Sequence, residues 1–100
     1  MATFRHIPLY HYEDYDDFFK HIPYGCPVIA VELADNSVPL ESFEHPERCI
    51  YLLGAEDHGL PEIILNRCRN TVQLMGDYCM NVATAGSIVM YDRARKRGIA

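Results

Sequence analysis

Apolar residues along the chain gather in short runs, separated by polar segments that contain proline or glycine. The clearest runs are Val28–Leu33 and Cys49–Leu53, and a third, mixed run is Thr71–Met75. Continuous apolar runs of this length are typical of strands that are covered on both faces, as in a parallel sheet. The pattern therefore predicts an α/β fold built on a parallel sheet.

Three other segments show helical spacing of their apolar residues. Glu13–His21 carries acids in its opening turn, Pro61–Cys68 begins with a proline that suits the first helical position, and Asn81–Arg97 is the longest of the three. Small residues dominate the first half of this last helix, so we expect close packing to compensate for Gly86. We expect Tyr91, farther along it, to pack in the interior.

Two further segments complete the expected order of elements. His6–Tyr12 alternates loosely and is rich in aromatic residues, which predicts a short strand, and Pro8 favours an edge position. Ala34–Glu47 is loop-like, with a helical turn around Leu40–Glu44. The length supports one domain over residues 1–100, and no internal repeat or low-complexity segment divides it.

Charge is distributed unevenly along the chain. The net charge of −5 argues against holding nucleic acid by bulk electrostatics. Residues 1–50 carry nine acids against three bases, whereas residues 51–100 carry five acids against six bases. Four of those bases gather near the C-terminus: Arg93, Arg95, Lys96 and Arg97. Such cations suit the end of a helix dipole and also a local contact with phosphate, and both roles are compatible.

The four cysteines are far apart and show no C-x-x-C spacing. This spacing predicts reduced thiols in a cytoplasmic protein and no metal site, and the histidines show no ligand spacing either. No apolar run approaches the length that crosses a membrane, and the N-terminus has no basic-then-apolar signal pattern. We therefore expect neither a membrane partner nor export.

Two glycine-containing loops, residues 54–59 and 76–81, form the best candidate site. Loops at the carboxyl ends of parallel strands are where open α/β folds bind ligands. Leu53, Leu74 and Met80 flank these loops and offer apolar walls, while the glycines let backbone groups approach a flat ring such as adenine. From the residues alone, two ordinary tight turns explain the same pattern equally well.

Two motifs in this half of the chain resemble those of a known family. LGAEDHGLP (Leu53–Pro61) resembles the second signature motif of the SpoU/TrmH class of SPOUT methyltransferases, and CMNVATAGSIVMYD (Cys79–Asp92) resembles the third. They stand in the family's order with suitable spacing, and the likeness extends through roughly the whole chain. The resemblance implies a SPOUT-type parallel-sheet α/β-knot, with a C-terminal trefoil knot. It also implies a shortened N-terminus, because the family's first motif, with its functional arginine, would precede Met1.

The resemblance further implies S-adenosyl-L-methionine as the cofactor and RNA as the partner. The cofactor-binding residues that it implies are Val31, Leu53, Gly54, Gly59, Leu74, Cys79 and Met80. It implies catalytic roles for Glu56 and Asn81. Structural roles are the alternatives, since Glu56 suits capping of backbone amides and Asn81 suits the N-cap of the last helix.

The function that the resemblance implies is ribose 2′-O-methylation of tRNA or rRNA by a homodimer packed through the last helix. Val82, Val89 and Met90 are expected to supply apolar surface for that dimer. The alternative is a catalytically impaired module that binds S-adenosylmethionine and RNA, or a fragment that lacks the first motif. Because no arginine here replaces the one in the first motif, we expect weak or absent methyl transfer by these residues alone.

Overall fold

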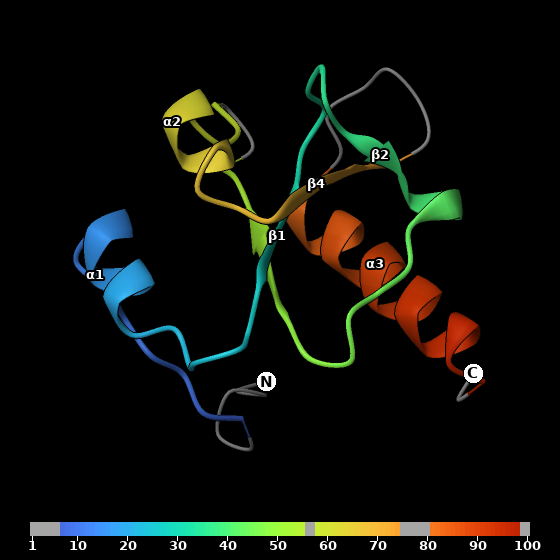
Figure 1. The fold of residues 1–100 in the computed structure, drawn as a ribbon, viewed down its shortest axis with the longest axis horizontal. Coiled ribbons are helices and arrows are strands. Elements are labelled where there is room, and N and C mark those ends of the chain that lie inside the picture. The colour runs from blue at the N-terminus through green and yellow to red at the C-terminus, as the bar shows by residue number, and fades with distance from the viewer. Residues whose placement is uncertain (1–6, 56–57, 75–80, 99–100) are drawn as a thin grey trace.

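The computed structural model describes residues 7–55, 58–74 and 81–98 and shows a parallel sheet with helices on both faces (Figure 1). The α/β fold predicted from the apolar runs is therefore confirmed. The elements in chain order are α1 (Tyr15–Lys20), β1 (Val28–Val31), β2 (Val38–Pro39), a 3-10 turn (Leu40–Ser42), β3 (Ile50–Leu53), α2 (Glu62–Leu65), β4 (Asn70–Gln73) and α3 (Val82–Lys96).

The four strands are arranged in the order β2-β4-β1-β3, and each neighbouring pair is parallel. In this register Val31, the last residue of β1, lies opposite Leu53 on one side and Val72 on the other. Because the strands are parallel, the carboxyl ends of β1, β3 and β4 meet at one edge of the sheet. The predicted site loop 54–59 follows β3 at this edge, whereas the predicted loop 76–81 lies, apart from Asn81, outside the described residues.

Alternate residues of the strands pack against two different helical layers. Ile29, Val31 and Val72 form a buried cluster with Val89 of α3. On the other face, Ala30 packs in a second cluster together with residues of α1 and α2. Figure 1 shows α1 and α2 on one side of the sheet and α3 on the other. All four residues of β1 are buried, as the apolar run predicts for a central strand.

The short helix α1 confirms the amphipathic helix predicted near the N-terminus. Asp14 is its N-cap and accepts a hydrogen bond from the backbone N–H of Asp17 at 2.8 Å. Its apolar side is held against the segment after α2, where the guanidinium of Arg67 lies 4.1 Å from the ring centroid of Phe19.

Two expectations about secondary structure are wrong. The described residues 7–12 form no strand, and Leu9 and Tyr10 are 62% and 71% exposed. Alternation and aromatic content favour a strand only where a neighbouring strand is available to pair with it. Conversely, β2 lies in a segment that we expected to be loop. It pairs with β4 at the outer edge of the sheet, where the missing N–H of Pro39 is tolerated.

The other elements lie in their predicted segments, with β4 beginning at Asn70 rather than Thr71. The helical turn expected around Leu40–Glu44 is the 3-10 turn at Leu40–Ser42.

Candidate active site

Three of the predicted cofactor residues lie together at the carboxyl edge of the sheet. Val31 is buried and faces Leu53 across the β1–β3 pair, and both Leu53 and Leu74 pack against the cluster that contains Val31. Gly86 of α3 passes beside them, since a Cβ placed on it would lie 3.7 Å from Cδ2 of Leu53. Val31 and Leu53 end β1 and β3, and Leu74 follows β4, so three neighbouring segments supply one apolar surface beneath the first half of α3. Binding of a flat ring against this surface stays a prediction.

The distance at Gly86 also corrects an expectation. A separation of 3.7 Å is ordinary van der Waals contact, so an alanine would fit at this position against the described residues. The close packing that we expected to compensate for Gly86 is therefore not found in the part of the chain that the structure describes.

The loop that follows β3 folds tightly on itself. The N–H of Gly59 donates to the carbonyl of Ala55 at 2.8 Å. A Cβ at Gly54 would lie 2.4 Å from the carbonyl carbon of Gly59 and 2.7 Å from the nitrogen of Leu60. Gly59 itself has φ of +65°, which a glycine adopts without strain. The chain's own backbone therefore requires both glycines, and their contact with a cofactor stays a prediction.

Glu32, which the sequence analysis did not single out, braces this loop. Its Oε1 accepts a hydrogen bond from the backbone N–H of Leu60 at 3.2 Å, and its carboxylate also lies against Gly59. The signal that could have found it is its position at the end of the apolar run Val28–Leu33. A charged side chain there must reach either solvent or a partner.

Asn81 takes the structural role that was the alternative to catalysis. Its side-chain oxygen accepts hydrogen bonds from the backbone N–H groups of Ala83 at 2.9 Å and Thr84 at 3.3 Å, which caps α3. Because α3 passes Leu53 near its own N-terminus, Asn81 belongs to the helix end at the carboxyl edge of the sheet. A catalytic role for Asn81 stays a prediction. Three other predicted site residues lie outside the described residues: Glu56, Cys79 and Met80.

A groove of about 640 Å³ opens beside the braced loop. It is lined by the segment after β1 and by the chain from α2 into β4, and Glu32, His58 and Leu60 form the part nearest the loop. Of the predicted cofactor residues that the structure describes, none lines this groove. The groove and the apolar surface beneath α3 are therefore separate features.

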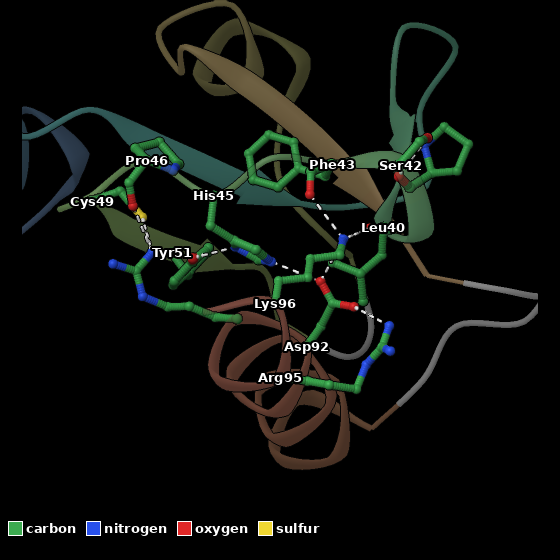
Figure 2. Close-up of polar contacts among 12 residues, drawn as sticks. Leu40, Ser42, Phe43, His45, Pro46, Cys49, Tyr51, Asp92, Arg95 and Lys96 are labelled. Atoms are coloured by element: carbon green, nitrogen blue, oxygen red, sulfur yellow. Dashed lines mark hydrogen bonds and ion pairs between the residues drawn. The ribbon is translucent and has the colours of Figure 1, made fainter. Parts of the chain in front are cut away.

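A second polar cluster lies near the other end of α3 (Figure 2). His45 is its centre: Nε2 is 2.7 Å from Oδ2 of Asp92, and Nδ1 is 2.6 Å from the hydroxyl of Tyr51. The side chain of His45 is only 2% exposed. Because a carboxylate only accepts, Nε2 donates to Asp92, and in the neutral imidazole Nδ1 accepts from Tyr51. Nζ of Lys96 lies 2.8 Å from the same carboxylate.

The surroundings of this cluster set the charge of two of its members. Burial alone would raise the pKa of Asp92, but the hydrogen bonds from Lys96 and His45 outweigh it and hold the pKa below its usual value. Burial, with the neighbouring Cys49, raises the pKa of Tyr51 to about 12, although the hydrogen bond from Arg93 acts in the opposite direction. At neutral pH the aspartate is therefore charged and the phenol is neutral.

Three of the four C-terminal bases donate to backbone carbonyls of the loop between β2 and β3. Lys96 donates to the carbonyl of Leu40 at 2.6 Å and to that of Phe43 at 2.8 Å. Arg93 donates to the carbonyl of Pro46 at 2.8 Å, and Arg97 donates to that of Glu47 at 3.1 Å. Arg95 instead remains 59% exposed and lies 4.0 Å from Asp92. The bases also stand far from the apolar surface, because the 15 residues of α3 span about 22 Å.

The outward face of α3 corrects two further expectations. Tyr91 is 61% exposed rather than interior, because helical spacing turns it away from Val89, which is 1% exposed. Val89 is therefore part of the core and supplies no surface for a dimer. Ile88 and Met90 are exposed on this helix, and a dimer contact through Met90 stays a prediction.

Within residues 7–55, 58–74 and 81–98, no group of three or more histidine, cysteine or acidic side chains is arranged to hold a metal ion. Over the same residues, no helix combines the length and the apolar character that crossing a membrane requires. The described cysteines are free thiols of intermediate burial: Cys26, Cys49 and Cys68.

The fold and this edge of the sheet define a parallel α/β domain that is consistent with a SPOUT methyltransferase. The family model of the SpoU rRNA methylases matches residues 1–91. The chain therefore belongs to the SpoU rRNA methylase family, as its second and third motifs predicted.

A solved structure concerned with the 2-OH methylation of C/U34 on tRNA is similar to the chain, with a TM-score of 0.74 and 27% sequence identity. The similarity covers 86% of this chain and 57% of that one, so the present chain spans little more than half of the similar protein. Among curated proteins, none matches the chain.

Proposed function

We propose that this chain is the methyltransferase domain of an S-adenosylmethionine-dependent RNA methyltransferase that modifies a ribose 2′-hydroxyl. The observation that carries the proposal is the convergence of Val31, Leu53 and Leu74 at the carboxyl edge of the sheet, in a chain of the SpoU family. The similar structure, which concerns 2-OH methylation on tRNA, supports ribose as the group modified and favours tRNA as the substrate.

The described residues fit the adenosyl part of the cofactor. The apolar surface of Val31, Leu53 and Leu74 suits an adenine ring, and the backbone groups where β3 and β4 end suit its nitrogens. When bound, S-adenosylmethionine supplies a methyl group carried on a positively charged sulfur. The part of the chain is to hold and orient the cofactor and to exclude water. The proposed contacts are Val31, Leu53, Gly54, Gly59, Leu74, Cys79 and Met80.

Orientation is the contribution that this rigid edge makes to the reaction. Correct alignment of reacting groups contributes roughly 7–11 kcal/mol in favourable cases. We propose that Asn81 acts at the end of α3 nearest the site, and that Glu56 acts from the loop after β3. Methyl transfer also requires removal of the proton of the ribose hydroxyl.

The proposal includes the finer features that the family resemblance implies. We propose the C-terminal trefoil knot of the family, and the structure supports only the packing of α3 on the loop between β2 and β3, through Arg93 and Lys96. The exposed Met90 and Tyr91 support a homodimer packed through α3. Exposed Arg95 is the base that we propose for contact with RNA phosphate. A cytoplasmic location remains part of the proposal.

Calorimetric titration with S-adenosylhomocysteine, followed by methyl transfer from labelled S-adenosylmethionine to total tRNA and rRNA, tests the function. Met80→Asp should abolish cofactor binding, because it places a charge at a proposed contact. Ile63→Asp is the matched control, since it introduces the same charge in place of an apolar side chain that is 71% exposed on α2. No binding by the wild type, or equal binding by both variants, would refute the proposed site. Methylation found on bases rather than on ribose would refute the proposed reaction.

A further inference from the structure

The backbone of Glu32 is fixed by the sheet. Its N–H donates to the carbonyl of Val72 at 3.0 Å, which continues the pairing of β1 with β4 one residue beyond Val31. A side chain at this point starts from a rigid position at the carboxyl edge. From this position the Glu32 side chain can hold a neighbouring loop in place.

The carboxylate of Glu32 reaches the returning part of the loop after β3. Oε1 accepts the N–H of Leu60 at 3.2 Å, and Leu60 is buried. A Cβ on Gly59 would lie 2.5 and 2.6 Å from the two carboxylate oxygens, so no other residue fits there while Glu32 stays in place. The position of the Glu32 carboxylate thus leaves room only for a glycine at position 59, although the two residues are far apart in sequence.

The segment that Glu32 holds lies directly against Gly54. The carbonyl carbon of Gly59 and the nitrogen of Leu60 are the backbone atoms nearest to a Cβ built at Gly54. A displacement of this segment would therefore move or release Gly54, the residue that follows Leu53 in the proposed cofactor site. Contact passes from Glu32, through residues 59 and 60, to Gly54 without a gap.

We propose that Glu32 is a positioning residue, whose carboxylate clamps Gly59 and Leu60 against Gly54 and so fixes the loop that receives the cofactor. This inference rests on the proposed function for the identity of the ligand, but the clamp itself is a property of the described residues. An acceptor oxygen is what the clamp needs, and the negative charge strengthens the hydrogen bond. Glutamine therefore replaces Glu32 in part, whereas alanine does not.

The test compares Glu32→Ala and Glu32→Gln with Asp35→Ala, an exposed acid that lines the same groove. Titration with S-adenosylhomocysteine should show a Kd raised roughly tenfold by alanine, as loss of one hydrogen bond to a charged group implies. The glutamine variant should recover most of this loss, and Asp35→Ala should leave Kd unchanged. RNA affinity, which a local clamp does not control, should be the same in all of them.

The amide chemical shift of Leu60, followed by NMR in the absence of ligand, reads the clamp directly. It should move on Glu32→Ala, move less on Glu32→Gln, and stay in place for Asp35→Ala. If the alanine variant does not fold, the glutamine variant and the wild type still decide, because a neutral acceptor in place of the carboxylate must move the Leu60 shift.

An unmoved Leu60 shift in Glu32→Ala, or unchanged cofactor affinity despite a moved shift, overturns the inference. So does a Leu60 shift that is the same in Glu32→Gln as in the wild type. Failure of the wild type to bind S-adenosylhomocysteine refutes the proposed function and, with it, the assignment of the clamp to a cofactor site. The shift of Leu60 would in that case show that the clamp holds the loop for structural reasons alone.

Discussion

Replacement of Asp92 by alanine is expected to destabilise the domain strongly without disturbing the proposed site directly. Asp92 is buried and accepts hydrogen bonds from His45 at 2.7 Å and Lys96 at 2.8 Å. Without it, the Nε2–H of His45 has no acceptor in a position that is 2% exposed. Lys96 still has the carbonyls of Leu40 and Phe43, so its charge stays partly compensated.

The magnitude follows from these two unequal losses. An unsatisfied buried donor costs about 1–3 kcal/mol, and breaking a buried ion pair costs about 3–5 kcal/mol when the remaining charge has no other partner. Because Lys96 keeps two acceptors, we expect Asp92→Ala to lower the free energy of unfolding by about 2–4 kcal/mol. Asp92→Asn keeps an acceptor for one donor and should cost less.

Urea denaturation at neutral pH measures this change, with Asp35→Ala as the exposed-acid control, which should stay within about 0.5 kcal/mol of the wild type. The pH dependence gives a second reading. The pKa of Asp92 is lowered in the folded protein, so its contribution is present above the unfolded value of about 3.9 and is lost as pH falls toward the folded value. Asp92→Asn should lack this loss. A cost below about 1 kcal/mol for Asp92→Ala, with an unchanged denaturant slope, would show that the cluster does not hold α3 to the loop.

Three further predictions concern other parts of the molecule. Gly54→Ala should lower the free energy of unfolding by about 1–3 kcal/mol, because the new Cβ meets the backbone of Gly59 at 2.4 Å, and a thermal melt would show whether it does. The free energy of unfolding of the wild type should fall as pH rises from about 10 toward 12. The reason is that the pKa of Tyr51 is raised to about 12 in the folded protein, so the phenol ionises more readily in the unfolded chain. Unfolding followed by ultraviolet absorbance should show no such decline for Tyr51→Phe. Arg95→Ala should weaken RNA binding and reduce its salt dependence while leaving stability unchanged, whereas Arg93→Ala should lower stability. Filter binding measures the first effect and urea denaturation the second. Loss of stability in Arg95→Ala, or loss of RNA binding alone in Arg93→Ala, would contradict this distinction.

The sheet was predictable because burial on both faces leaves a direct trace in the sequence. Val28–Val31 is a continuous apolar run, and it became the fully buried central strand. The order of the strands left no such trace. β2 escaped prediction because its two residues carry no periodicity and become a strand only by pairing with β4. The opposite error concerns the aromatic segment before α1. Its composition favours a strand, but among the described residues it pairs with no other strand.

The polar clusters were beyond prediction for a related reason. His45 and Asp92 are separated by 47 residues, and Glu32 and Leu60 by 28, so neither pair forms a local pattern. Cations near a helix C-terminus suit a dipole, a carbonyl or a phosphate equally well, and only the tertiary structure separates Arg93 from Arg95. By contrast, the motif around Gly54 was recognisable, because its residues are consecutive in the chain.

The bonds that join α3 to the loop between β2 and β3 also bear on how the chain reaches its native state. The contact of Lys96 with Leu40 closes a span of 56 residues, which is more than half of the chain. Contacts of such sequence separation carry a large loop-closure entropy and tend to slow folding. If they form after the main barrier, weakening them speeds unfolding and hardly alters the folding rate. The cluster around His45 would then slow the unfolding of the native state, and so determine how long the domain stays folded.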